Sequence, residues 1–347
     1  MDPFFHKKNS LESEGKNEYS SPYIQGIAME KYQILAFYHF VPIEDPHAEV
    51  KRQKKFLQTL DAKARIYISP EGVNAQMSLR TEDAKTYLDW LTSDPRFSGI
   101  NLKVDPFDEH VLPKLTVKFR KSLVALGISP DPEKGGEHVS PQKWKEMLEA
   151  RDEDTLLLDV RNDYETEVGH FEGAERPDIR YFREFPDYAE RLQKVKDPAK
   201  TKVMMYCTGG IRCELYSTLL KEKGFEEVYQ LDGGIIRYGQ EVGDSHWKGS
   251  LFVFDDRLNI PISGKEHTPI STCAHCDNLT DAYYNCANMD CNELFLSCPE
   301  CAEKLQGCCG EECLGTERRR PFEQTVRPKP FRKWYNYMEN KKCPVST

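Results

Sequence analysis

The amino-acid sequence predicts a multidomain α/β protein, and three observations support this fold class. Residues 30–124 alternate strand and helix patterns, residues 140–246 repeat a strand–helix unit, and nine of the twelve cysteines fall within residues 273–313. A chain of 347 residues is long enough for two or three domains, each with its own core. We therefore expect an α+β domain, then a parallel α/β sheet, and then a cysteine-rich tail.

Residues 30–124 have the pattern of a ferredoxin-like α+β domain. Alternating apolar residues mark the strands, and apolar residues at helical spacing mark two helices. The order βαββαβ is typical of that fold, an open sheet with both helices on one face. The expected elements are a strand at Gln33–Val41, a helix from Pro46, strands at Arg65–Ser69 and Val73–Leu79, a helix capped by Thr81, and strand-like pieces at Leu102–Val104 and Pro113–Lys121.

The last of these strands has one basic face. Lys118 and Arg120 share it, whereas Leu115, Val117 and Phe119 share the opposite face. A basic face of this kind suits contact with the phosphate backbone of RNA. A solvated sheet edge gives the same alternation, and from the strand pattern alone it is the favoured interpretation.

A second domain follows a short connection. Residues 125–139 are rich in proline, glycine and charge, and we expect a linker there. Residues 140–246 then carry three apolar strands near Leu156–Arg161, Val203–Tyr206 and Val228–Leu231, separated by helical patterns. Alternating units of this kind predict a doubly wound parallel sheet covered on both faces.

Cys207 is the candidate nucleophile of this domain. With Asp159 and Arg161 it falls at the C-terminal ends of the strands, where ligand sites of such sheets lie. Two glycines and a helical pattern follow Cys207, and the dipole and free N–H groups of that turn favour a thiolate. A buried structural cysteine is the alternative, but the glycines and Arg212 favour a nucleophile. The expected active-site loop comprises Thr208, Gly209, Gly210, Ile211 and Arg212.

The length of this loop argues against a phosphatase. Cysteine phosphatases need the pattern Cys-x5-Arg, but here Arg212 comes one position too early and Cys213 occupies the place of the arginine. A shorter loop fits a smaller charge, such as a thiolate, a persulfide or a developing oxyanion. Cys213 itself is expected to pack within its helix or to resolve an oxidised Cys207.

The cysteine-rich domain, residues 247–315, has the spacing of metal ligands. Two Cys-x2-Cys pairs are of the zinc-knuckle type, and two tetrahedral sites need eight of the nine cysteines. Thiols without metal, reduced or redox-active, are the alternative. The first expected site comprises Cys273, Cys276, Cys298 and Cys301, and the second comprises Cys286, Cys291, Cys313 and either Cys308 or Cys309, with Cys309 as the working candidate.

The last segment, residues 316–347, interleaves basic and aromatic side chains. Such a mixture suits RNA, which offers phosphates and bases that stack. A solvated C-terminal arm has a similar composition. Arg332, Lys333 and Trp334 are the candidate RNA-binding residues of this segment.

The charge and hydrophobicity of the chain indicate the cellular compartment in which we expect it. The formal net charge of −9 argues against indiscriminate nucleic-acid binding, although a local basic patch remains compatible with it. No apolar run approaches the ~18 residues of a membrane-spanning helix. Residues 1–29 have no hydrophobic signal core and predict a flexible extension. We therefore expect a cytoplasmic protein without a membrane partner, whose cysteines serve metal or redox chemistry.

Four motifs in the second domain occur in a familiar order. They are Leu158–Arg161, Gly169–Ala174, the loop after Cys207, and Leu231–Ile235. In this order they resemble the rhodanese domain. The resemblance implies that Cys207 lies in a cradle of backbone N–H groups and that Asp159 and Arg161 stabilise the sheet end around it.

The wider chain, from about residue 30 to 315, resembles the rhodanese-type tRNA uridine hydroxylases. The resemblance rests on the run Tyr206–Glu214, the preceding ferredoxin-like domain, the segment Phe254–Arg257 and the cysteines of Cys286–Cys291. It implies 5-hydroxylation of wobble uridine 34 in the anticodon loop of tRNA, with dioxygen as co-substrate and a reductant. A protein that donates sulfur or electrons is a further expected partner.

Within that activity, Cys207 is expected to act as a thiolate or persulfide on oxygen or on the pyrimidine ring. Arg212 is expected to close the loop and to hold developing negative charge. The alternative from another reaction class is a sulfurtransferase that carries a persulfide on Cys207. A third possibility is an RNA- or protein-binding module whose cysteines are structural.

Overall fold

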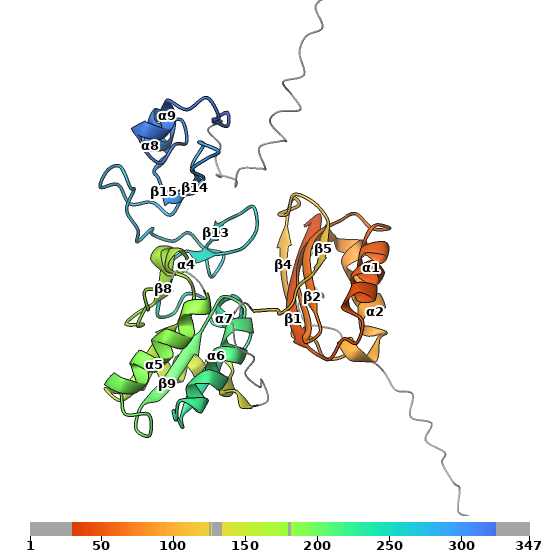
Figure 1. Cartoon of the computed structure of the whole chain (residues 1–347), viewed down its shortest axis with the longest axis vertical. Coiled ribbons are helices and arrows are strands. Elements are labelled where there is room, and N and C mark those ends of the chain that lie inside the picture. Colours follow the sequence, from red (N-terminus) through yellow and green to blue (C-terminus); the bar gives the residue numbers. More distant parts are fainter. Residues whose placement is uncertain (1–29, 125, 127–133, 180–181, 324–347) are drawn as a thin grey trace, which may run out of the picture.

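The computed structural model describes residues 30–124, 126, 134–179 and 182–323 (Figure 1). The predicted extension 1–29 and the candidate RNA-binding residues Arg332, Lys333 and Trp334 lie outside these ranges. Among the helices that the structure describes, none combines the length and hydrophobicity needed to cross a bilayer.

The N-terminal domain is a five-stranded sheet with two helices on one face (Figure 1). Its strand order is β4-β1-β3-β2-β5, in which β5 runs parallel to β2 and the other pairs are antiparallel. The predicted ferredoxin-like order is confirmed. The elements are β1 (Tyr32–Phe40), α1 (Pro46–Leu57), β2 (Ala62–Ser69), β3 (Gly72–Arg80), α2 (Thr81–Thr92), the 3-10 helix η1 (Pro95–Phe97), β4 (Lys103–Phe107) and β5 (Thr116–Phe119).

Local chemistry sets the boundaries of these elements. Asp45 caps α1, because its carboxylate accepts a hydrogen bond from the N–H of Ala48 at 2.9 Å. Gly72 begins β3 with φ of +145°, and a Cβ there would lie 2.0 Å from the carbonyl oxygen of His39. The predicted cap at Thr81 is wrong. Thr81 is the first residue of α2, and its hydroxyl donates to the carbonyl of Glu30 at 2.8 Å instead.

The central domain is a four-stranded parallel sheet in the order β6-β10-β9-β7. The end of the predicted linker, Glu137–Val139, is its strand β6, so the sheet starts before residue 140. The other elements are α3 (Pro141–Glu149), β7 (Thr155–Asp159), α4 (Asp163–Val168), β8 (Gly169–Phe171), the 3-10 helix η3 (Phe182–Glu184), α5 (Phe185–Val195), β9 (Lys202–Tyr206), α6 (Ile211–Glu222), β10 (Val228–Leu231) and α7 (Gly234–Glu241).

Helices cover both faces of this sheet. Neighbouring residues of β9 point to opposite sides: Met205 joins a core with α5 and α6, whereas Met204 joins a core with α3 and α7. Both methionines are fully buried. The predicted doubly wound architecture is confirmed, and it places the carboxyl ends of β7 and β9 side by side.

The remaining residues form short strands and two small helices. Trp247–Gly249 is β11, which pairs with β8 and so extends the central domain rather than the cysteine-rich part. The others are β12 (Leu251–Phe252), β13 (Asn259–Ile260), β14 (Tyr283–Asn285), β15 (Leu294–Leu296), α8 (Pro299–Lys304) and α9 (Glu311–Leu314). Strands β12 and β13 form one antiparallel pair, and β14 and β15 form another.

The segment Phe254–Arg257 joins the N-terminal sheet to the rest of the molecule. Arg65 donates to the carbonyl of Phe254 at 2.8 Å, and Gln76 donates to Asp255 at 3.0 Å. Arg257 in turn donates to Asp255 at 2.7 Å. Asp255 is buried, whereas the bond from Arg65 is exposed, and together these bonds hold the N-terminal sheet against the segment that follows the central domain.

Candidate active site and cysteine clusters

The candidate nucleophile lies between β9 and α6. Cys207 directly follows β9, and Gly210 is the residue that caps α6. Gly210 has φ of +103°, and a Cβ on it would lie 2.7 Å from the phenol oxygen of Tyr38. A larger residue there would be strained and would collide with the N-terminal domain. The other predicted loop residues are Thr208, which is buried, Gly209 and Ile211, which are half-buried, and Arg212, which is buried.

Backbone N–H groups surround the sulfur of Cys207. The N–H of Gly210 donates to Sγ at 3.1 Å, and those of Arg212 and Cys213 also donate to it. Burial alone raises the pKa of this thiol, but the Cys213 thiol, the Arg212 guanidinium and the N–H groups lower the pKa to about 5. The side chain is fully buried. Cys207 is therefore a thiolate at neutral pH, inside the molecule.

Cys213 supports that ionised state. It is fully buried on α6, and burial together with the neighbouring Cys207 raises its pKa well above the ordinary value. A thiol that stays protonated beside a thiolate acts as a hydrogen-bond donor to it. The structure thus places Cys213 both in the core and in contact with Cys207.

Arg212 closes the loop through a residue that the sequence did not single out. Its guanidinium donates to both carboxylate oxygens of Glu165, at 2.6 and 2.8 Å, and to the hydroxyl of Thr208 at 3.2 Å. Glu165 is fully buried at the first turn of α4, where it also completes a capping box with Asn162. The pattern Asn-x-x-Glu at Asn162–Glu165, a capping-box signature, was the available signal for it.

Asp159 and Arg161 form a buried pair at the end of β7. The guanidinium lies 2.6 Å from Asp159 and donates to the carbonyl of Gly169 at 2.5 Å, and neither side chain is exposed. A Cβ on Gly169 would lie 1.9 Å from the carbonyl oxygen of Ser250. The pair therefore ties the end of β7 to the start of β8.

The start of α7 holds the loop from its carbonyl side. The N–H of Ile235 donates to the carbonyl of Cys207 at 3.0 Å, and that of Ile236 to the carbonyl of Thr208 at 3.1 Å. Gly234 has φ of +68°, and a Cβ on it would lie 2.6 Å from the Cys207 carbonyl oxygen. Only glycine allows this approach between the two loops.

The N-terminal domain covers the site. The phenol of Tyr38 donates to Glu214 at 2.7 Å, and the same carboxylate lies 3.1 Å from the ring of His138. A cavity of about 350 Å³ opens beside these groups, which is within the size range of small-ligand sites. Its lining residues are Tyr38, His39, Phe40, Gly99, Asn101, His138, Glu214 and Asp232.

The two basic candidates at the β5 edge lie elsewhere. Lys118 lies on β5 and Arg120 directly after it, both are exposed, and β5 is the sheet edge opposite to β4. The Arg120 guanidinium lies 4.6 Å from the centre of the Tyr67 ring. The side chains of Lys118 and Arg120 thus face solvent at this edge.

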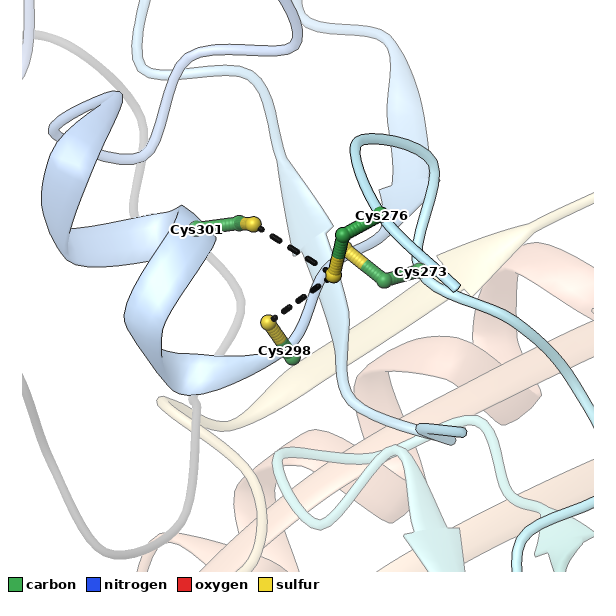
Figure 2. A group of neighbouring side chains, drawn as sticks. All are labelled: Cys273, Cys276, Cys298 and Cys301. Atoms are coloured by element: carbon green, nitrogen blue, oxygen red, sulfur yellow. Dashed lines mark hydrogen bonds between the residues drawn. The ribbon is translucent and has the colours of Figure 1, made fainter. Parts of the chain in front are cut away.

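Eight of the nine cysteines between residues 273 and 313 form two groups of four. In each group the four sulfur atoms lie within 4.8 Å of one another. In the first group, drawn in Figure 2, Cys276 lies 3.8 Å from Cys298 and 3.7 Å from Cys301, sulfur to sulfur. The first group is Cys273, Cys276, Cys298 and Cys301, and the second is Cys286, Cys291, Cys309 and Cys313.

These distances fit a tetrahedral metal site. Zn–S bonds of about 2.3 Å place neighbouring sulfurs of a tetrahedron about 3.8 Å apart. In the second group the sulfur of Cys309 lies 3.6 Å from that of Cys291 and 3.8 Å from that of Cys313. Cys308 stands outside, since its thiol donates to the carbonyl of Cys313 at 3.4 Å. The structure therefore selects Cys309 over Cys308.

Backbone N–H groups also reach these sulfurs. The N–H of His275 donates to Cys273, and that of Cys309 to Cys286, each at 3.4 Å. Such bonds stabilise thiolates, the form that binds metal. His275 offers its backbone and not its ring, so it is not among the ligands of the first group.

Each of the three domains matches a known protein family. Residues 32–123 match the UPF0176 acylphosphatase-like domain, residues 140–241 the rhodanese-like domain, and residues 248–314 the rhodanese C-terminal domain. The solution structure of a rhodanese-like domain from Anabaena is 23% identical and covers 32% of this chain and 78% of that chain, with a TM-score of 0.27.

Named relatives match nearly the full length. The tRNA uridine(34) hydroxylase of Chlamydia pneumoniae is 54% identical over 306 residues, which are 88% of this chain and 94% of the relative. The protein of the same name from Protochlamydia amoebophila is 52% identical over 88% of this chain and 96% of its own. At this identity and coverage, the chain belongs to the tRNA uridine(34) hydroxylase family.

Proposed function

We propose that this protein hydroxylates the wobble uridine of tRNA at C5, with Cys207 as the reactive sulfur. The observation that carries the proposal is a thiolate held ionised in a buried cradle, in a chain that shares all its domains with hydroxylases of that name. The proposed stoichiometry consumes dioxygen: the C5–H bond, O2, two electrons and two protons give C5–OH and water. A reductant therefore supplies the two electrons.

The chain's own groups are proposed to share the work as follows. The cradle holds negative charge on the sulfur, either as thiolate or as persulfide, where it meets oxygen or the pyrimidine ring. Arg212 keeps the loop closed through Glu165 and adds positive charge beside the sulfur. Asp159 and Arg161 hold the surrounding sheet end.

We place the uracil base in the cavity beside the loop. Tyr38 and Phe40 offer aromatic walls, and Asn101 and His138 offer groups that pair with the polar edge of a pyrimidine. The anticodon loop already exposes base 34, so the enzyme has little unstacking to do. We propose that Lys118 and Arg120, together with Arg332, Lys333 and Trp334 of the tail, contact the tRNA outside the base, chiefly at its phosphate backbone. We also propose that the enzyme is cytoplasmic.

The test is the nucleoside content of tRNA. A strain lacking the protein is complemented with wild type, Cys207→Ser or Cys308→Ser, and 5-hydroxyuridine is measured by mass spectrometry. We expect the modification with wild type and with Cys308→Ser, whose thiol lies outside the sulfur groups. We expect none with Cys207→Ser, and its persistence there would remove this sulfur from the chemistry.

A sulfurtransferase is the second candidate, because an N–H cradle around a sulfur anion also suits a persulfide. Thiocyanate formation from thiosulfate and cyanide measures that activity. Two results together would favour sulfur transfer over hydroxylation. The protein would form thiocyanate in this assay, and tRNA from a strain that lacks the gene would still contain 5-hydroxyuridine.

We also propose that each cysteine group binds one structural zinc ion. Four thiolates at tetrahedral spacing are typical of closed zinc sites, and the metal would stabilise a region with few apolar residues. Purified protein should then contain two zinc ions per chain by elemental analysis, and Cys301→Ser should lose one. Cys308→Ser should retain both. Protein that is folded but free of zinc would refute the proposal.

A further inference from the structure

Lys103 is a buried cation at the boundary between the N-terminal and central domains. It is the first residue of β4 and is only 5% exposed. Its ammonium lies 5.0 Å from the centre of the Tyr38 ring and 3.5 Å from the carbonyl oxygen of Asn101. Over the described residues, no carboxylate lies within ion-pair distance of it. A buried ammonium without such a partner is unfavourable, so its charged form needs stabilisation by a nearby anion beyond ion-pair distance.

The carboxylates around Lys103 already have their own donors. Asp232 accepts hydrogen bonds from Asn101 and Arg237, and Glu214 accepts them from Tyr38. Asp232 is thus paired with a guanidinium, whereas the partners of Glu214 are the phenol of Tyr38 and the ring of His138.

The two arginines of the site are likewise occupied. Arg161 pairs with Asp159, and Arg212 donates both arms of its guanidinium to Glu165. Both arginines are thus paired with a buried carboxylate. Among the described residues Lys103 has no such partner, but a series of contacts leads from it to the sulfur of Cys207. Its ammonium lies over the ring of Tyr38, the phenol oxygen of Tyr38 lies beside Gly210, and the N–H of Gly210 donates to the sulfur at 3.1 Å.

The electrostatics of Lys103 agree with this balance. Burial, with a smaller contribution from Arg237, lowers the pKa of Lys103 to about 8, against the opposing effect of nearby anions. Of these anions Cys207 is the strongest, ahead of Asp232 and Glu214. The ammonium is therefore largely charged at neutral pH, and the sulfur favours that charged state.

We propose that Lys103 is the countercharge of the Cys207 sulfur, supplied across the domain boundary. The N-terminal domain then belongs to the active site, as the source of a positioning residue that keeps the sulfur anionic. This inference concerns the charge state of Cys207 and holds for either candidate activity.

The first test measures the ionisation of Cys207 directly. The rate of its alkylation by iodoacetamide is followed across pH by mass spectrometry of the peptide that contains it, in wild type, Lys103→Met, Lys103→Arg and the exposed-lysine control Lys51→Met. We expect Lys103→Met to raise the midpoint by about 0.5 to 1 pH unit, at the low end of the effect of an opposite charge. The shift is small because the N–H cradle, Cys213 and Arg212 contact the sulfur more closely. Lys103→Arg and Lys51→Met should keep the wild-type midpoint.

The second test removes the anion instead of the cation, so the protein in which the titration is measured keeps Lys103. Carbon NMR of lysines labelled at Cε follows the titration of Lys103, with Lys103→Arg used only to assign its signal. The Cys207→Ser variant lacks the anion, so we expect the titration midpoint of Lys103 to fall. The size of this fall should equal the rise in the Cys207 midpoint that Lys103→Met causes. The two shifts must be equal because coupling between two sites is reciprocal.

Each outcome decides the proposal. Equal and opposite shifts support it. A folded Lys103→Met with an unchanged Cys207 midpoint overturns it. If Lys103→Met does not fold, an unchanged Lys103 titration in Cys207→Ser overturns it by itself. Unchanged far-UV circular dichroism defines the folded state of each variant.

Discussion

Replacing Glu165 with glutamine tests the ion pair that closes the loop. Glu165 and Arg212 form two charge-assisted hydrogen bonds at 2.6 and 2.8 Å, with side chains 0% and 4% exposed. Removing one charge of a buried pair leaves the other uncompensated, which costs about 3 to 5 kcal/mol. Glutamine keeps the shape and one acceptor, so we expect the lower value, about 3 kcal/mol.

Hydrogen exchange measures this loss within the central domain. At 1.4 kcal/mol for each factor of ten, about 3 kcal/mol corresponds to roughly a hundredfold faster exchange of the slowest amides of β9. Peptide-resolved exchange followed by mass spectrometry reports these amides without interference from the other domains. Glu172→Gln is the matched control, because Glu172 pairs with Lys248 at 2.7 Å on the open surface. We expect the control to leave exchange of β9 unchanged.

The double variant separates charge balance from packing. With Glu165→Gln and Arg212→Met together, no buried charge is left unpaired, and most of the lost protection should return. Wild-type exchange in the single variant would refute the assigned role of the pair. Loss of protection that persists undiminished in the double variant would instead show that packing, and not charge, holds the loop.

Three further outcomes follow from the same loop. The folded pKa of Cys207 lies near 5, below its unfolded value of 9.0, so alkylation should proceed at full rate above about pH 6 and fall with a midpoint near 5. The stability that the thiolate contributes should be complete above the unfolded pKa and should be lost progressively as pH falls from there through the folded pKa. Cys213→Ala should raise the alkylation midpoint by about one pH unit, because the sulfur loses a hydrogen-bond donor. Gly234→Ala should abolish the 5-hydroxyuridine product in the complementation assay, because its Cβ would collide with the carbonyls of Cys207 and Thr208. Gly264→Ala has a similar φ of +71° but open space around it, and it should retain the product.

Local patterns predicted those parts of the molecule whose causes are local. The apolar run of β9 and the glycines after Cys207 were enough to predict a strand, a turn and a helix. The Cys-x2-Cys spacing likewise predicted the first sulfur group, because ligands two residues apart approach one ion without help from the rest of the fold. Between Cys308 and Cys309 the spacing does not distinguish, and only the fold directs one of two adjacent thiols into the group.

The features that the sequence did not indicate depend on contacts between distant residues. Tyr38 and Glu214 are 176 positions apart, and no periodicity connects a tyrosine of one sheet with a helix of the next domain. Strand β6 was missed because two of its three residues are exposed, so it has no apolar run. Glu165 was not singled out, because its contact with Arg212 appears only when the fold brings two residues 47 positions apart side by side.

Burial and ionisation of Cys207 oppose each other. This conflict explains why the N–H cradle, the side chains of Cys213 and Arg212, and the N-terminal domain all meet at one loop. Removing a thiolate from water raises its pKa, so each layer of cover makes the reactive form less stable. The cradle, Cys213 and Arg212 compensate from within the central domain, and Tyr38 of the N-terminal domain covers the same loop at Gly210. A domain that buries an anion without bringing charge would suppress the reactivity that it shelters. Lys103, which enters on the neighbouring strand β4 of the same sheet, supplies that charge as part of the cover.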